Sequence, residues 1–313
     1  MAENVYAPEG MLLNLPENRE YISSLAGLER AMTEGKILEG IALVCDSDMD
    51  LHVDLGGLRG IIPKSEALFC REGEEPKDIA IITRVGKAVC FKVVSIERKG
   101  ASVKIILSRR EAQLECMHNF LMSLVPGDIV SARVTHLEGF GAFVDIGCGL
   151  VCLLSVDCIS VSRISHPSDR FHVGEHIKVV IKSIDYNTGR IFVTHRELLG
   201  TWEENAALFE TGQTVAGIVR SIENYGIFVE LTPNLAGLAE LKPDVFVGQT
   251  SSVYIKNIIP EKMKIKLVLI DSKCGEIIVN PPKYYIDTAK VTHLDRWVYS
   301  TPASSKVIET VFA

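Results

Sequence analysis

The sequence lacks the long apolar runs of a membrane protein and the leader of a secreted one. No apolar run approaches the roughly 18 residues that a membrane-spanning helix needs. The first residues, Met-Ala-Glu-Asn-Val-Tyr, contain no basic segment followed by an apolar core, so we expect no secretory signal. The eight cysteines show no paired spacing, which favours reduced thiols over disulfides. We therefore expect a cytoplasmic protein that does not contact membranes.

The motifs of common catalytic sites are also missing. The sequence contains no Walker phosphate loop, no Gly-x-Ser-x-Gly elbow and no His-Glu-x-x-His zinc motif. Asp46, Asp48 and Asp50 alternate without the other ligands of a calcium loop, which favours a solvated turn. Three cysteines between residues 148 and 158 lie near several histidines, but their spacing is too loose for a zinc site. We predict no enzyme activity, no metal, no cofactor and no small-molecule substrate.

An excess of basic residues, common among nucleic-acid-binding proteins, is absent because the net charge is -7. The acidic excess lies in residues 1–33 and in two connectors, 111–123 and 198–207, whereas the segments between them are close to neutral. Tight non-specific binding of duplex DNA is therefore not expected. Binding through local cations and base stacking remains open.

The sequence does contain one pattern that is repeated three times. Segments that begin at Glu34, Pro126 and Thr211 each open around a glycine and continue into an alternating, β-branched run. Each then reaches a second strand pattern, and later a Val-Gly pair opens a further strand and a hairpin. The clearest hairpin has Asn-Thr-Gly at 187–189 as its turn. Five short strands in each repeat predict a small closed barrel, because closure removes exposed strand edges.

The sequence therefore predicts an all-β protein of three tandem five-stranded barrels joined by short helical connectors. Leucines and aromatic residues at helical spacing place these connectors at about 110–124 and 197–209. The expected divisions are an N-terminal extension at 1–33, barrels at 34–110, 124–197 and 208–270, and a C-terminal extension at 271–313 that could pack on the last barrel.

The second repeat carries the residues on which a family resemblance rests. It reads Phe-Gly-Ala-Phe-Val-Asp-Ile-Gly over 140–147, Arg-Ile-Ser-His-Pro over 163–167 and Ile-Asp-Tyr-Asn-Thr-Gly-Arg-Ile over 184–191. In this order and spacing the segments resemble the S1 RNA-binding domain, the OB-fold module of the ribosomal protein S1 family. The third repeat, with Tyr-Gly-Ile-Phe-Val-Glu over 225–230, is a plainer member, and the first is divergent. The resemblance implies S1-type OB-fold barrels over about 34–270.

The resemblance also implies an RNA-facing surface. In the family the rings matching Phe140 and Phe143 face RNA, where a flat apolar ring can stack on an unpaired base. The expected RNA-binding residues are Phe140, Phe143, His166, Arg190, Tyr225 and Phe228. A phenylalanine that alternates with valine could instead belong to the barrel core. Asp185, which matches the family's charged partner of Arg190, is expected to stabilise a turn, because a carboxylate repels phosphate.

Two departures from the family pattern bear on function. The family's third strand carries a histidine that helps to hold RNA, but Pro63, Ser155 and Glu240 stand at that position in the three repeats. The first repeat also lacks the aromatic pair and is expected to bind protein or to pack internally.

The leading prediction is a single-stranded RNA-binding protein, with mRNA as its RNA, that acts in the translation apparatus through stacking and local cations. The small ribosomal subunit is a second candidate partner. The alternative is a protein-interaction module that docks on the ribosome or another partner with little RNA contact. The missing histidines and the acidity favour this alternative, whereas the aromatic pair of the second repeat argues against it.

Overall fold

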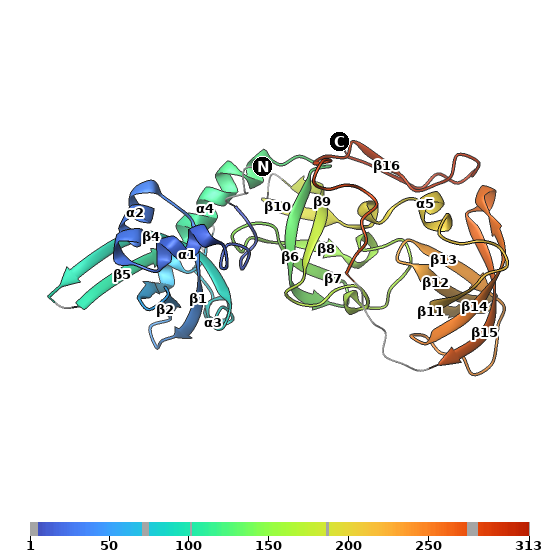
Figure 1. The fold of residues 1–313 in the computed structure, drawn as a ribbon, viewed down its shortest axis with the longest axis horizontal. Helices are drawn as coiled ribbons and strands as arrows, with labels where there is room; N and C mark the ends of the chain where they lie inside the picture. Colours follow the sequence, from blue (N-terminus) through green and yellow to red (C-terminus); the bar gives the residue numbers. More distant parts are fainter. Residues whose placement is uncertain (1–5, 71–74, 101, 186–187, 274–280, 313) are drawn as a thin grey trace. The chain divides into compact units, whose positions relative to one another are not determined.

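The structure is a computed structural model that describes residues 6–70, 75–100, 102–185, 188–273 and 281–312 (Figure 1). The chain divides into two compact units. Unit 1 comprises residues 1–124 with 145–151, and unit 2 comprises residues 125–144 with 152–313. Within the described ranges, no helix combines the length and the apolar character needed to cross a membrane.

Three closed five-stranded barrels follow one another along the chain, and all share one strand order. The first contains β1 (Leu38–Cys45), β2 (Leu51–Asp54), β3 (Arg59–Ile62), β4 (Ala88–Lys99) and β5 (Ser102–Ser108). The second contains β6 (Ile129–Glu138), β7 (Gly141–Asp145), β8 (Val151–Ser155), β9 (His176–Asp185) and β10 (Arg190–Thr194). The third contains β11 (Thr214–Glu223), β12 (Gly226–Thr232), β13 (Leu235–Ala239), β14 (Thr250–Ile259) and β15 (Lys264–Lys273).

In each barrel the third and fifth strands pair in parallel, and the first strand pairs with the fourth to close the sheet. Closure leaves no long unpaired edge, as the five-strand pattern of the sequence requires. The prediction of an all-β chain of tandem OB-type barrels is confirmed. The helices that accompany the barrels are few and short.

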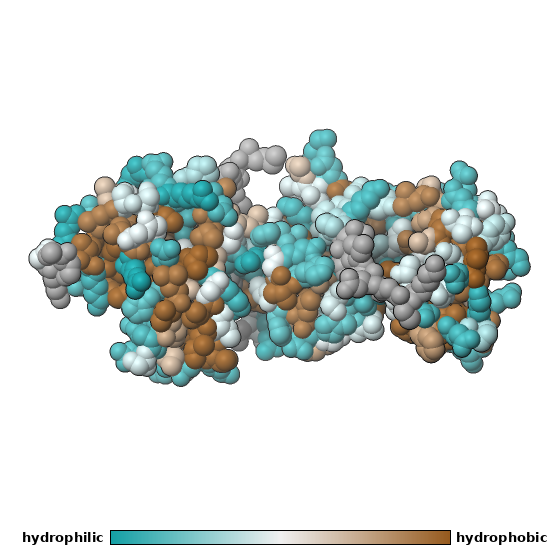
Figure 2. All heavy atoms as spheres, turned by 60° about the horizontal axis from the view of Figure 1, so that its bottom comes forward, coloured by the Kyte–Doolittle hydropathy of each residue, from teal (hydrophilic) through white to brown (hydrophobic). Residues whose placement is uncertain are grey.

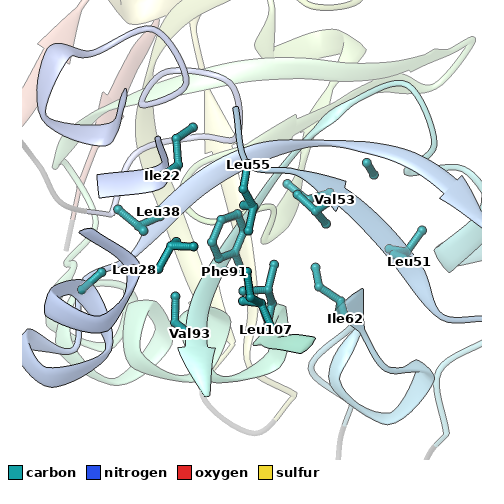
Figure 3. Packing of buried hydrophobic residues seen from close by; sticks show 14 of the residues in the cluster. Ile22, Leu28, Leu38, Leu51, Val53, Leu55, Ile62, Phe91, Val93 and Leu107 are labelled. Atoms are coloured by element: carbon teal, nitrogen blue, oxygen red, sulfur yellow. The ribbon is translucent and has the colours of Figure 1, made fainter. Parts of the chain in front are cut away.

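Helices contribute buried residues to the core of the first barrel. They are α1 (Pro16–Ile22), α2 (Leu25–Glu34) and α3 (Asp78–Ile82), and a further helix, α4 (Arg109–Asn119), follows β5. The helix α2 begins where the Ser24 hydroxyl accepts a hydrogen bond from the Gly27 backbone, and it ends at Gly35 in the left-handed conformation. Ile22 and Leu28 pack into the same apolar cluster as Phe91 of β4, as Figure 3 shows. Residues before the first repeat therefore form part of this barrel's hydrophobic core.

The second connector is shorter than the sequence suggests. It consists of a 3-10 turn, η5 (Arg196–Leu199), and the short helix α5 (Trp202–Ala206). A capping box begins α5, in which the Thr201 side chain and the Glu204 side chain each accept a backbone N–H of the other residue. The cap fixes where the chain turns from the second barrel toward the third.

The C-terminal segment adds a small two-stranded sheet, β16 (Arg296–Val298) and β17 (Glu309–Val311). Trp297 and Tyr299 are buried in the apolar cluster of the third barrel. Phe312 packs against Leu198 and Val180, which belong to a separate cluster beside the second barrel. The described part of 281–312 therefore contributes to the hydrophobic interior of unit 2.

A buried ion cluster joins a loop of the second barrel to strands of the third. Arg170, from the passage between β8 and β9, lies 2.5 Å from the Glu230 carboxylate, and Arg220 of β11 lies 2.8 Å from the same carboxylate. Arg220 also reaches Asp169 at 3.2 Å. These two arginines and Glu230 are almost completely buried, so the pairing offsets a large desolvation cost.

Candidate nucleic-acid interface

Two phenylalanines form an outward-facing pair on the second barrel. Phe140 lies in the turn between β6 and β7 and is 57% exposed. Phe143 lies on β7 between Ala142 and Val144, which are fully buried in the barrel, so its half-buried ring points to the outer face. The ring centroids are 5.9 Å apart and the planes meet at 89°. This edge-to-face contact holds both rings beside solvent.

Gly141 makes this arrangement possible. A Cβ at this position would lie 2.5 Å from the Leu154 carbonyl oxygen on the neighbouring strand β8. Because only glycine fits so close to the neighbouring backbone, β7 can begin directly after the exposed ring of Phe140.

The third barrel repeats the pair with different residues. Tyr225 lies in the turn between β11 and β12 and is 65% exposed, and Phe228 lies half-buried on β12. Their ring centroids are 6.0 Å apart and their planes also meet at 89°. The same geometry therefore arises from two different local sequences.

Two further residues extend the surface of the second barrel, and neither is among the RNA-binding residues expected from the sequence. The His136 ring on β6 stacks on Phe143 with centroids 6.3 Å apart and planes inclined by 29°. Phe192 on β10 is half-buried and pairs in register with Leu153 of β8. Alternation along β10 places Phe192 on the same face as Arg190, which is the sequence signal that could have identified it. We call Phe140, Phe143, Phe192 and His136 the second-barrel platform.

In the third barrel, the position that corresponds to Phe192 holds a cation instead of an aromatic ring. Phe228 pairs with Leu238 of β13, and Leu238 pairs with Lys266 of β15. Lys266 is exposed and occupies the position that Phe192 has in the second barrel, because each pairs with the matching leucine of the third strand. We call Tyr225, Phe228, Leu238 and Lys266 the third-barrel platform.

The remaining residues expected from the sequence lie in different surroundings. Arg190 is exposed at the start of β10, two residues before Phe192. Asp185 accepts hydrogen bonds from the Thr188 backbone and hydroxyl, at 3.2 and 2.5 Å, as a turn-stabilising residue does. Tyr186 and Asn187 of the expected turn lie outside the described residues.

His166 has a local structural contact. Its Nδ1 accepts a hydrogen bond from the Ser168 backbone at 3.2 Å and so caps the 3-10 turn η4 (Pro167–Asp169). The ring contacts described for the chain place it in neither aromatic pair. The structure thus brings together Phe140 with Phe143 and Tyr225 with Phe228, and it gives His166 a separate place.

Carboxylates lie close to the position of the family's histidine. The Ser155 hydroxyl donates to the Asp157 carboxylate, and this hydrogen bond lowers the pKa of Asp157. Asp157 is therefore ionised at neutral pH beside the end of β8. In the third barrel, the exposed Glu240 stands at the same position. Both acids disfavour phosphate at this end of the third strand.

Among the described residues of the first barrel, no pair of aromatic rings matches these platforms. His52 stands where Phe143 stands in the second barrel, and its Nε2 lies 2.8 Å from the Asp46 carboxylate. The hydrogen bond with His52 lowers the pKa of Asp46. The other oxygen of Asp46 accepts the backbone N–H groups of Asp48 and Asp50, which makes the aspartate run a turn. In the described part of the chain, no group of histidines, cysteines and acids is arranged to hold a metal.

Comparison with protein families identifies the second barrel. The family described as "S1 RNA binding domain" matches residues 124–196. The middle barrel belongs to this family. The match covers all five strands of this S1 domain and includes every residue of the second-barrel platform.

Curated relatives place the chain among ribosomal protein S1 sequences. It is similar to the small ribosomal subunit protein bS1 homolog of Bacillus cereus, with 33% identity over 214 residues, 66% of this chain and 51% of that protein. It is also similar to the homolog of Bacillus subtilis, with 31% identity over 231 residues, 71% of this chain and 56% of that protein. The chain thus spans about half the length of these curated relatives.

Among solved structures, a multidomain protein with nucleic acid binding domains from Streptococcus pneumoniae matches 78% of this chain and 76% of that chain. The identity is 16% and the TM-score is 0.24. A score this low supports no comparison of function.

Proposed function

We propose that the protein binds single-stranded RNA on the outer faces of its second and third barrels. The observation that carries this proposal is the aromatic pair of the S1 domain, whose rings lie 5.9 Å apart beside solvent. Its repetition in the third barrel supports a surface selected for flat ligands. An unpaired base has such a face, and stacking on an aromatic side chain tolerates any base.

The binding mode follows from the residues around the rings. Phe140 and Phe143 offer a base two perpendicular ring surfaces, and Phe192 and Arg190 continue the face along β10. Arg190 can contact a phosphate or stack on a base. With Ser155 and Glu240 at the positions of the family's histidine, affinity rests on stacking and on a few cations and not on strict sequence readout.

The cellular setting follows from the relatives. Their names assign them to the small ribosomal subunit. We propose by this relationship that the chain acts in the cytoplasmic translation apparatus with mRNA as its RNA, and that it catalyses no reaction.

A titration of labelled single-stranded RNA with the full chain tests this function. The double variant Phe140→Ala/Phe143→Ala should weaken binding, because each lost stacking contact costs about 1–3 kcal/mol, or about 5- to 150-fold in Kd. The matched control is His52→Ala, which removes the side chain at the equivalent position of the first barrel and should leave affinity unchanged. If the double variant and the wild-type chain bind RNA with equal affinity, the result would favour the alternative, a protein-interaction module with little RNA contact.

One observation favours the alternative for the first barrel. Exposed apolar side chains gather around α3 and the bulge of β1, and they comprise Leu43, Val44, Ile79, Ile82 and Val85. Backbone hydrogen bonds between Ala42 and the turn at Gly86–Lys87 hold the two segments side by side. Figure 2 shows apolar residues in brown over the surface of unit 1. Apolar patches of this kind are typical of protein contacts, so this barrel is the candidate for docking on a protein partner.

A further inference from the structure

We propose that the third barrel contains a phosphate-backbone site for single-stranded RNA, formed by Lys264 and Lys266 beside the third-barrel platform. The inference rests on the proposed function and assigns the two barrels different tasks. The second barrel supplies stacking surfaces, and the third supplies most of the cationic contacts that make binding sensitive to salt.

The register of the sheet carries the geometry. Phe228, Leu238 and Lys266 are direct cross-strand neighbours on β12, β13 and β15, so they form one row on the outer face. Two strand spacings separate the first from the last, roughly 10 Å. A base stacked on Phe228 would therefore have its neighbouring phosphate within reach of the Lys266 ammonium. Lys264 lies two residues earlier on β15 and faces the same side.

The charge of this region supports an anionic ligand. The stretch 256–266 contains four lysines, at 256, 262, 264 and 266, and one acid, Glu261. All four lysines are exposed, and the ion pairs found in the described residues include none of them. Glu230 of β12 is buried and held by two arginines. The exposed Glu240 lies two residues after Leu238, just past the end of β13. The third repeat is neutral as a whole, but its cations collect on one hairpin.

The comparison with the second barrel separates stacking from charge. Phe192 stands at the position of Lys266, since each pairs with the leucine of its third strand. The equivalent platforms therefore present a ring in one barrel and an ammonium group in the other. An acidic peptide would also be drawn to the lysines. The perpendicular rings of Tyr225 and Phe228 beside them favour a ligand with stacking bases.

The test measures Kd of an unstructured labelled RNA against salt concentration, using the full chain. Each phosphate contact on single-stranded RNA contributes a slope of about -0.7 to the logarithmic plot. The variant Lys264→Gln/Lys266→Gln should therefore lose a slope of about 1.4 relative to wild type. The matched control, Lys290→Gln/Lys306→Gln, removes two exposed lysines from the C-terminal segment and should keep the wild-type slope.

The outcomes distinguish the two proposals. If the wild-type chain binds RNA and the Phe140→Ala/Phe143→Ala variant binds it more weakly, the proposed function stands. An unchanged slope in the Lys264→Gln/Lys266→Gln variant would then overturn the phosphate site alone. If wild type does not bind RNA, or if a poly-glutamate peptide binds in its place and depends on the same two lysines, the RNA assignment of this surface is overturned.

Discussion

Phe192 gives the sharpest test of the second-barrel platform, because the sequence resemblance does not include it. The ring is half-buried on β10, and its backbone pairs with Leu153 on one side and Ser183 on the other. Phe192→Leu keeps an apolar side chain over Leu153 but removes the flat ring. If one base stacks there, the loss is about 1–3 kcal/mol, which corresponds to a Kd about 5- to 150-fold weaker.

Fluorescence anisotropy with a labelled unstructured RNA measures this loss at fixed salt. Phe192→Tyr is the matched control, since it keeps the ring and should bind within about twofold of wild type, well under the ~1.4 kcal/mol of a tenfold change. Urea unfolding of both variants checks that the barrel is intact. The salt slope should not change in either variant, because no charge is removed.

Stacking of a base on Phe192 is refuted if Phe192→Leu binds RNA as tightly as wild type while Phe140→Ala/Phe143→Ala binds weakly. In that case the base lies across the β6–β7 turn and does not extend over β8 to β10. A loss of affinity in the tyrosine variant as large as in the leucine variant would equally contradict a stacking role.

Three further predictions concern stability. Trp297→Ala should lower the free energy of unfolding by about 3–5 kcal/mol, because it leaves a cavity in the third-barrel core. Urea unfolding, followed by the fluorescence of the remaining tryptophan, Trp202, measures this loss. An unchanged midpoint would refute the packing of Trp297. Glu230→Gln should cost about 3–5 kcal/mol in the same assay, because it removes the carboxylate that two buried arginines share and leaves only Asp169 beside Arg220. Burial lowers the pKa of His195 to about 4. The unfolded chain takes up this proton near pH 6.5, so the contribution of His195 to the unfolding free energy should fall by roughly 3 kcal/mol between pH 6.5 and 4. His195→Asn should show a shallower acid slope, and parallel slopes would contradict the assignment.

The barrels could be predicted because their pattern is local. Period-two alternation and turn residues recur in each repeat, and a five-strand set with this spacing has closure as its main solution. The exposed positions of Phe140 and Tyr225 also follow from the sequence, since each residue precedes the glycine that opens a strand.

The remaining parts depend on contacts between distant residues. The outward position of Phe192 and Lys266 requires the parallel register of the third and fifth strands, and bulges shift the register of the neighbouring β9–β10 and β14–β15 pairs. The packing of Leu28 into the first barrel and of Trp297 into the third joins segments far apart in the chain. Hydrophobic periodicity predicts neither of these two contacts, because it shows which face of an element is buried but not which other segment packs against that face.

The ion cluster of Arg170, Glu230 and Arg220 has a consequence for affinity. Under the proposed function the two platforms would act as a bivalent receptor, because this cluster joins a loop of the second barrel to strands of the third. Once one platform is occupied, the next nucleotides meet the other at an effective concentration of roughly millimolar. Two weak sites can then retain a long strand that neither would hold alone, while an oligonucleotide too short to reach both would dissociate quickly.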